Sequence, residues 1–156
     1  MRKKGKEHAG MNTDNRTIQE IEDEIVGEFS MFEDWMSKYE YIIELGKHLP
    51  LIDARYKTDE FKVSGCQSQL WLHAEMKDGK LYFSADSDAV ISKGIIALLI
   101  RAMSGHSPAE ILKSDLEFLD KIGMRVHLSP NRSNGLTSMI NYMKNYAKMY
   151  AGQSVQ

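Results

Sequence analysis

Cys66 is the only cysteine among the 156 residues of the chain, and its surroundings are those of a reactive group. It lies in the polar segment 63–68 (VSGCQS), between two candidate strands and next to Gly65, a residue type that permits unusual backbone angles. A cysteine kept for packing more often lies inside an apolar run. From these residues alone, a reactive thiol and a packed thiol both remain open.

A reactive Cys66 would need activation, because the nucleophile is the thiolate and not the thiol. Backbone amides of the loop or a nearby cation would lower the pKa of the thiol. Arg132 and His127 are the cationic candidates, although their distance from Cys66 does not follow from the sequence. No histidine stands at a spacing typical of a catalytic triad.

Metal chemistry is poorly supported by the residue pattern. The chain has five histidines, but none is paired as HxxxH and Cys66 has no second thiol beside it. Iron-sulfur clusters normally need several thiolates. The triplet 86–88 (DSD) would bind a cation weakly, and we interpret it instead as a cap for the helix that follows. The sequence therefore predicts no metal site and no cofactor bound by this chain.

Charge and hydropathy exclude other classes of partner. Lys plus Arg number 20 against 22 Asp plus Glu, so no large basic field is available for nucleic acid. The longest apolar stretch, residues 94–100, is far shorter than the roughly 20 residues that cross a bilayer.

The N-terminal residues are polar and lack the apolar region of a signal peptide. A lone thiol persists most easily in a reducing compartment. We expect a cytoplasmic protein with a disordered polar tail at 1–15 and a single domain at 16–152.

Hydrophobic periodicity predicts several helices. Thr17 and Glu20 form a capping-box pattern ahead of the first, and Gly46 is expected to end the second in a left-handed conformation. A core helix that is apolar nearly all round should follow the sheet, and a long helix should close the chain. The expected helices cover 18–30, 35–45, 89–103, a short stretch from Pro108, 116–122, and 136–150.

The period changes to two at residues 69–76, which is typical of a half-buried strand. The turn residues 77–80 and the returning strand 81–85 complete a hairpin, and residues 61–63 are expected to add a third strand. A further extended piece is expected at 124–128. The predicted fold class is therefore α+β, with a small antiparallel three-stranded sheet packed against several helices.

Four segments, in order, resemble the SufE family over roughly residues 18–150. Residues 35–46 (WMSKYEYIIELG) are similar to the family's WxxKYxYIIELG segment, and residues 65–71 (GCQSQLW) to its GCQSxVW loop. Residues 86–94 (DSDAVISKG) are similar to DSDAxxxKG, and residues 127–136 (HLSPNRSNGL) to HLxPxRSxGL. The departures are small, and none removes a reactive group.

This resemblance implies a fold shared with the IscU-type scaffolds and the role of a sulfur acceptor. Cys66 would take persulfide sulfur from a SufS-like cysteine desulfurase, whose pyridoxal phosphate stays on that partner. The chain would thereby stimulate the desulfurase. The sulfur would pass on to iron-sulfur cluster assembly, with scaffold proteins as further partners; a monomer and a homodimer both fit. The resemblance also implies supporting residues of the loop or the docking surface: Gly65, Gln67, Ser68, Asp86, Asp88 and Arg132.

A persulfide exposed to water and other thiols would be lost by exchange. We therefore expect Cys66 to alternate between an inward, weakly reactive setting and an outward one engaged with the partner, with Gly65 absorbing the backbone change. Two other classes stay open. A stand-alone thiol enzyme, such as a peroxidase or acyl transferase, would need a positioned base or cations. A structural adaptor would not need Cys66 at all.

Overall fold

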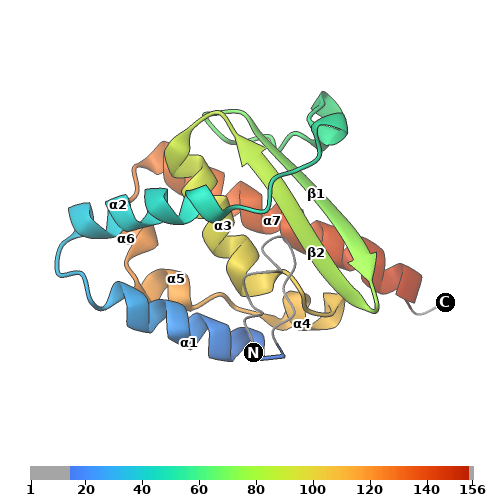
Figure 1. Ribbon diagram of the computed structural model, residues 1–156, viewed down its shortest axis with the longest axis horizontal. Coiled ribbons are helices and arrows are strands. Elements are labelled where there is room, and N and C mark those ends of the chain that lie inside the picture. The colour runs from blue at the N-terminus through green and yellow to red at the C-terminus, as the bar shows by residue number, and fades with distance from the viewer. Residues whose placement is uncertain (1–14, 155–156) are drawn as a thin grey trace, which may run out of the picture.

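The computed structural model describes residues 15–154, so the predicted tail at 1–15 lies almost wholly outside the described residues (Figure 1). A two-stranded antiparallel hairpin lies across the molecule, formed by β1 (Leu70–Lys77) and β2 (Lys80–Ser87). Its turn places Asp78 and Gly79 at positive φ, which suits the right-handed twist of the strands. The predicted hairpin is confirmed.

The predicted third strand at residues 61–63 is wrong. Asp59–Phe61 is a turn of 3-10 helix, and Lys62 makes only an isolated bridge to Trp71 of β1. The N–H of Val63 donates to the Leu70 carbonyl over 2.8 Å. Pairing ends there because the chain turns at the positive φ of Gly65. The fold class is α+β as predicted, with two strands in the sheet.

Helices cover the hairpin and one another. α3 is buried along most of its length and contacts α2, β2 and α7, while α7 runs behind the hairpin (Figure 1). Tyrosine hydroxyls of α7 donate to backbone carbonyls of β1, which fixes this packing. The helices are α1 (Ile18–Phe29), α2 (Trp35–Leu45), α3 (Val90–Met103), α4 (Pro108–Lys113), α5 (Phe118–Lys121), α6 (Met124–His127) and α7 (Pro130–Ser154), with 3-10 turns at Gly46–His48, Ala54–Tyr56 and Asp59–Phe61.

Capping residues set the helix starts that the sequence predicted. The capping box of Thr17 and Glu20 begins α1, and a second one, formed by Ser107 and Glu110, begins α4. Each satisfies backbone N–H groups that have no partner within the helix. The predicted starts of α1 and α4 are confirmed.

Three local predictions are wrong. The extended piece at 124–128 is the short helix α6, which follows Gly123 at φ 85°. Helix α7 starts at Pro130 and not at 136, because the Ser129 hydroxyl accepts from the Arg132 N–H over 3.3 Å and proline suits the first helical position. Gly46 is right-handed at φ −62° and leads into a 3-10 turn.

Position 46 requires a glycine because two helices pack closely there. A Cβ at Gly46 would lie 2.8 Å from the backbone nitrogen of Gly94 in α3. The two glycines therefore let α2 and α3 approach within backbone contact. This contact holds the beginning of α3, which forms one wall of the pocket described below.

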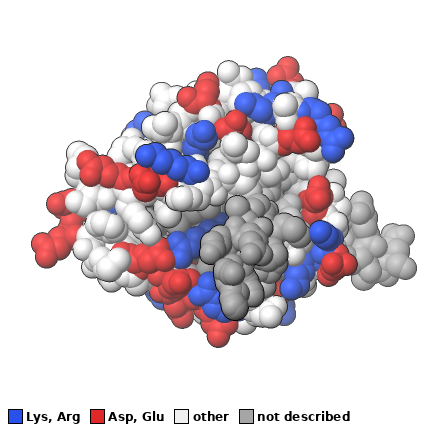
Figure 2. All heavy atoms as spheres, viewed as in Figure 1, with Lys and Arg blue, Asp and Glu red and all other residues white. Residues whose placement is uncertain are grey.

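The surface carries both signs of charge. On the face shown in Figure 2, acidic and basic side chains are interspersed and no broad basic field stands out. No helix within residues 15–154 is both long enough and apolar enough to cross a membrane.

Candidate functional site

Cys66 lies in the loop 64–68, hereafter the Cys66 loop, between the bridge at Lys62 and the start of β1. Gly65 has φ 92°, a backbone conformation that residues with a Cβ rarely adopt. A Cβ at Gly65 would also overlap the hydroxyl of Ser138 in α7. Glycine is therefore required at this position both by the turn and by the close approach to α7.

The first half of the Cys66 loop lies along one stripe of α7. Ser64 bonds the hydroxyl of Tyr142, Gly65 approaches Ser138, and the Cys66 Sγ lies 3.9 Å from the Gly135 carbonyl oxygen. The three α7 residues are spaced by three and four positions, so they share one helix face. Successive loop residues thus contact successive turns of the helix.

The second half of the loop is held by α3 and the segment before it. The Ser68 and Ser92 hydroxyls lie 2.8 Å apart, and the N–H of Gln69 donates to Asp88 Oδ1 over 3.0 Å. Asp88 therefore supports the end of the Cys66 loop.

The predicted cap function of the triplet 86–88 is wrong for its two aspartates. The N-cap residue of α3 is Ala89, whose own side chain makes no cap bond, and the Ser87 hydroxyl oxygen accepts from the Ala89 N–H over 3.3 Å. Asp86 instead lies near two lysines, 2.9 Å from Lys57 Nζ and 3.6 Å from Lys93 Nζ. Asp86 does not line the pocket beside Cys66, so the structure places it outside the immediate surroundings of the thiol.

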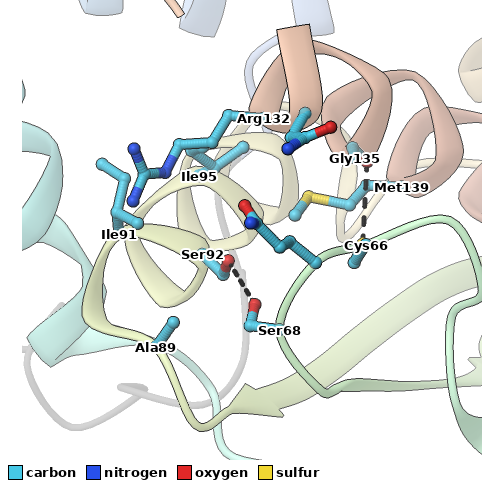
Figure 3. Close-up of a pocket in the computed structure, with 11 residues that line it drawn as sticks. Cys66, Ser68, Ala89, Ile91, Ser92, Ile95, Arg132, Gly135 and Met139 are labelled. Carbon is cyan, nitrogen blue, oxygen red and sulfur yellow. Dashed lines mark hydrogen bonds between the residues drawn. The ribbon is translucent and has the colours of Figure 1, made fainter. Parts of the chain in front are cut away.

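Cys66 opens onto a pocket of about 310 Å³ between the loop, α3 and α7 (Figure 3). One part of its wall is apolar and comes from Ile91, Ile95 and Met139. Arg132 reaches from α7 toward Ile91 of α3, on the opposite side from Cys66. The pocket is lined by Cys66, Gln67, Ser68, Ala89, Ile91, Ser92, Ile95, Asn131, Arg132, Gly135 and Met139.

The thiol of Cys66 is partly buried and weakly acidic. Burial raises its pKa, since the charged thiolate loses solvation in the pocket wall. A raised pKa means that the resting thiol is mostly protonated at neutral pH and reacts slowly as a nucleophile. Burial is the cause of this shift, so activation of the thiol by a nearby cation stays a prediction.

The two cations proposed from the sequence are in different places. Arg132 lines the pocket, with its guanidinium 5.9 Å from the ring centre of Tyr39. His127 stacks on Trp35 at 4.9 Å and does not line the pocket. Of these two, Arg132 is therefore the one placed to act on a group that enters the pocket.

Several residues of the site were not found from the sequence. Met139 was marked only by the apolar period of the last helix, and the sequence did not single out Ser138 and Tyr142 on the same helix. Ser92 lies in the first turns of α3. Their contact with the Cys66 loop depends on how α7 and α3 pack.

Among residues 15–154, no group of three or more His, Cys, Asp or Glu side chains could hold a metal ion.

Fold and site together define a class: a small α+β protein that presents one partly buried thiol at a pocket. The family model described as "SufE: Fe-S metabolism associated domain" matches residues 23–147. The chain therefore belongs to the SufE family, as its sequence motifs indicated.

Curated relatives carry SufE-like names. An uncharacterised SufE-like protein of Rhizobium meliloti is 42% identical over 131 residues, which cover 81% of this chain and 94% of the relative. An uncharacterised SufE-like protein of Synechocystis is 35% identical over 141 residues, which cover 90% of this chain and 89% of the relative. SufE-like protein 1 of Arabidopsis thaliana, chloroplastic/mitochondrial, is 39% identical over 125 residues, which cover 80% of this chain and 34% of that longer protein.

A solved structure has a similar fold. The solution structure of a hypothetical protein from Thermus thermophilus matches with a TM-score of 0.69 and 18% identity, covering 83% of this chain and 94% of that one. At this identity the match supports the fold alone. It agrees with the α+β class predicted from the sequence.

Proposed function

We propose that Cys66 accepts a sulfur atom from a pyridoxal-phosphate-dependent cysteine desulfurase and holds it as a persulfide. The observation that carries this proposal is the position of the chain's single thiol, partly buried beside a pocket on a loop that turns at the positive φ of Gly65. Membership of a family described by Fe-S metabolism supports a sulfur cargo.

The transfer is a thiol-persulfide exchange. The Cys66 thiolate attacks the terminal sulfur of a persulfide on the desulfurase, and a new sulfur-sulfur bond forms at Cys66 Sγ. The sulfur-sulfur bond on the partner breaks, and its cysteine leaves as a thiolate. The proton that Cys66 gives up passes to solvent or to the departing thiolate, so no external oxidant or reductant is needed. A cleared desulfurase can turn over again, which makes this chain a stimulator of that enzyme.

The apolar wall of the pocket gives the terminal sulfur shelter from other thiols. Ile95 and Met139 line the space beside Cys66 and offer no group that would attack a persulfide. The pocket of about 310 Å³ exceeds the room that one added sulfur needs. A stored persulfide would therefore exchange slowly until the loop moves outward.

The raised pKa of Cys66 favours transfer by contact with a partner over independent catalysis. A stand-alone thiol enzyme needs a base or cation at the thiol. The partner of Cys66 Sγ within residues 15–154 is the Gly135 carbonyl oxygen, which cannot take the thiol proton as a base does. We infer that the chain works in a reducing compartment such as the cytoplasm, passes its sulfur to cluster assembly, and binds neither the pyridoxal phosphate nor a metal.

The proposal is tested by the turnover of a purified cysteine desulfurase, followed as alanine released from cysteine. The wild-type chain should increase the rate, whereas Cys66→Ser should not, although its thermal unfolding should match that of the wild type. A structural adaptor would stimulate equally with either variant. Peroxide or ester turnover by the chain alone would favour a thiol enzyme instead.

A further inference from the structure

Tyr142 makes a polar contact between α7 and the Cys66 loop. Its hydroxyl oxygen lies 3.2 Å from the backbone nitrogen of Ser64 and 2.9 Å from the Ser64 Oγ. The backbone N–H can only donate, so the phenol oxygen accepts that bond. The two hydroxyls share the second bond, in which either can be the donor. One side chain thus bonds both the main chain and the side chain of Ser64.

Ser64 is the residue from which the loop turns. Gly65 follows at φ 92°, and Cys66 comes next, so fixing Ser64 on α7 fixes where the turn begins. The neighbouring contacts with α7 are weaker. Gly65 approaches Ser138 so closely that a Cβ would overlap the hydroxyl, and the Cys66 Sγ lies 3.9 Å from the Gly135 carbonyl oxygen.

We propose that Tyr142 is a positioning residue for sulfur transfer, whose hydroxyl seats Ser64 on α7 and so sets how often Cys66 leaves the pocket. The inference rests on the proposed function for its purpose, but it concerns the free protein and is tested without a desulfurase. Tyr142 is partly exposed, so water competes for its hydroxyl and the contact can break and reform.

The acid-base behaviour of the phenol agrees with this geometry. The bonds to the Ser64 side chain and backbone lower the pKa of Tyr142, because both groups can donate to the charged phenolate. Tyr146, a turn further along α7, has different partners, because its hydroxyl donates to the Leu72 carbonyl in β1 over 3.1 Å. Tyr146 secures the helix to the hairpin, and its hydroxyl bonds a strand and not Ser64.

The test is the rate at which iodoacetamide alkylates Cys66 in the free full-length chain. Tyr142→Phe loses both bonds to Ser64, and we expect a rise of about tenfold, the order by which two ordinary hydrogen bonds shift such an equilibrium. Ser64→Ala loses only the side-chain bond and should give a smaller rise. Ser64→Thr keeps a hydroxyl and should react like the wild type.

Tyr146→Phe is the matched control, because it removes one tyrosine hydroxyl from the same helix. Its alkylation rate should stay close to that of the wild type. The pH profile gives a second readout: in Tyr142→Phe the apparent pKa of the Cys66 thiol should fall toward that of a free cysteine, since the thiol spends more time in water.

Equal alkylation of Tyr142→Phe and the wild type would overturn the inference, as would an equal rise in Tyr146→Phe, which would indicate general loosening of α7. If Tyr142→Phe does not fold, the comparison of Ser64→Ala with Ser64→Thr decides, and equal rates for these two would also overturn it. A wild-type chain that accepts no sulfur would refute the proposed function while leaving these rates unaffected.

Discussion

The backbone N–H of Gln69 donates to Asp88 Oδ1 over 3.0 Å, joining the end of the Cys66 loop to the segment between β2 and α3. A hydrogen bond to a carboxylate is shorter and stronger than one between neutral groups. The bond between Ser68 and Ser92 reinforces the same attachment. The loop is therefore held at this end by α3 and its approach, and at the other end by α7.

Replacing Asp88 by alanine should loosen the loop. The amide of Gln69 would lose its acceptor, and we expect a loss of about 1 kcal/mol in the free energy of unfolding together with faster alkylation of Cys66. Urea unfolding and iodoacetamide kinetics measure the two effects. Asp59→Ala is the control, because this carboxylate is almost fully exposed, 97% for its side chain, beside Lys62. An Asp88→Ala thiol that reacts no faster than the wild type would show that this bond does not restrain the loop.

Gly65→Ala should destabilise the folded protein. The positive φ and the overlap with Ser138 together predict a loss of about 1–3 kcal/mol in the free energy of unfolding. Gly27→Ala is the control: its Cβ would meet nothing within 4 Å in α1, and the change should stabilise the helix by about 0.5–1 kcal/mol. Chemical denaturation of both variants checks the contrast. If Gly65→Ala proved neutral, the loop conformation described above would be wrong.

The reactivity of Cys66 should depend on pH with a midpoint above that of an unfolded chain, for which about 8.5 is usual. Burial raises the pKa of the Cys66 thiol, so the folded protein keeps the proton to higher pH than the unfolded one does. The free energy of unfolding should consequently fall as pH rises from the pKa of the unfolded thiol to that of the folded one. Cys66→Ala should remove this dependence on pH. Alkylation rates in native buffer and in urea give the two midpoints. Coincident midpoints would contradict the burial of the thiol.

Glu22 is a buried carboxyl far from the site, with 4% of its surface exposed, and the Ser114 hydroxyl donates to it over 3.1 Å. Burial raises the pKa of Glu22, so its contribution to stability is greatest below the pKa of the unfolded chain and is lost as pH rises through the folded one. Glu22→Gln keeps an acceptor for Ser114 and removes the charge.

We expect Glu22→Gln to melt about 2–4 °C higher at neutral pH, corresponding to about 1 kcal/mol in a domain of this size. The gain should disappear under acidic conditions, where the wild-type carboxyl is neutral. Melting curves across pH, with the exposed Glu44→Gln as control, measure both effects. A lower melting temperature for Glu22→Gln at neutral pH would show that the charged form is the stabilising one.

Local signals made much of the fold predictable. The capping box at Thr17 and the period-two pattern of residues 69–76 act within a few residues, and both elements form as predicted. The start of α7 was missed because Asn, Ser and Gly in residues 131–135 resemble a loop, while Ser129 and Pro130 supply the cap and first turn. The predicted third strand does not form, because a single bridge at Lys62 cannot sustain a strand when the chain turns at Gly65.

The candidate site was predictable only in part. Its thiol stands out because a lone cysteine follows a glycine in a polar segment. Arg132 was a cationic candidate from the residues, and the resemblance to SufE implied it again. Tyr142 could not be found this way, because its partner Ser64 lies 78 residues away and the pairing depends on how α7 packs against the hairpin. Contacts of this kind are set by tertiary structure and leave no local pattern.

The most direct test of sulfur acceptance is the intact mass of the chain after incubation with a cysteine desulfurase and free cysteine. We predict a gain equal to one sulfur atom, located on the peptide that contains Cys66 and removed by a reducing thiol. The Cys66→Ser variant should gain nothing. An unchanged wild-type mass, while the desulfurase is turning over, would contradict the account.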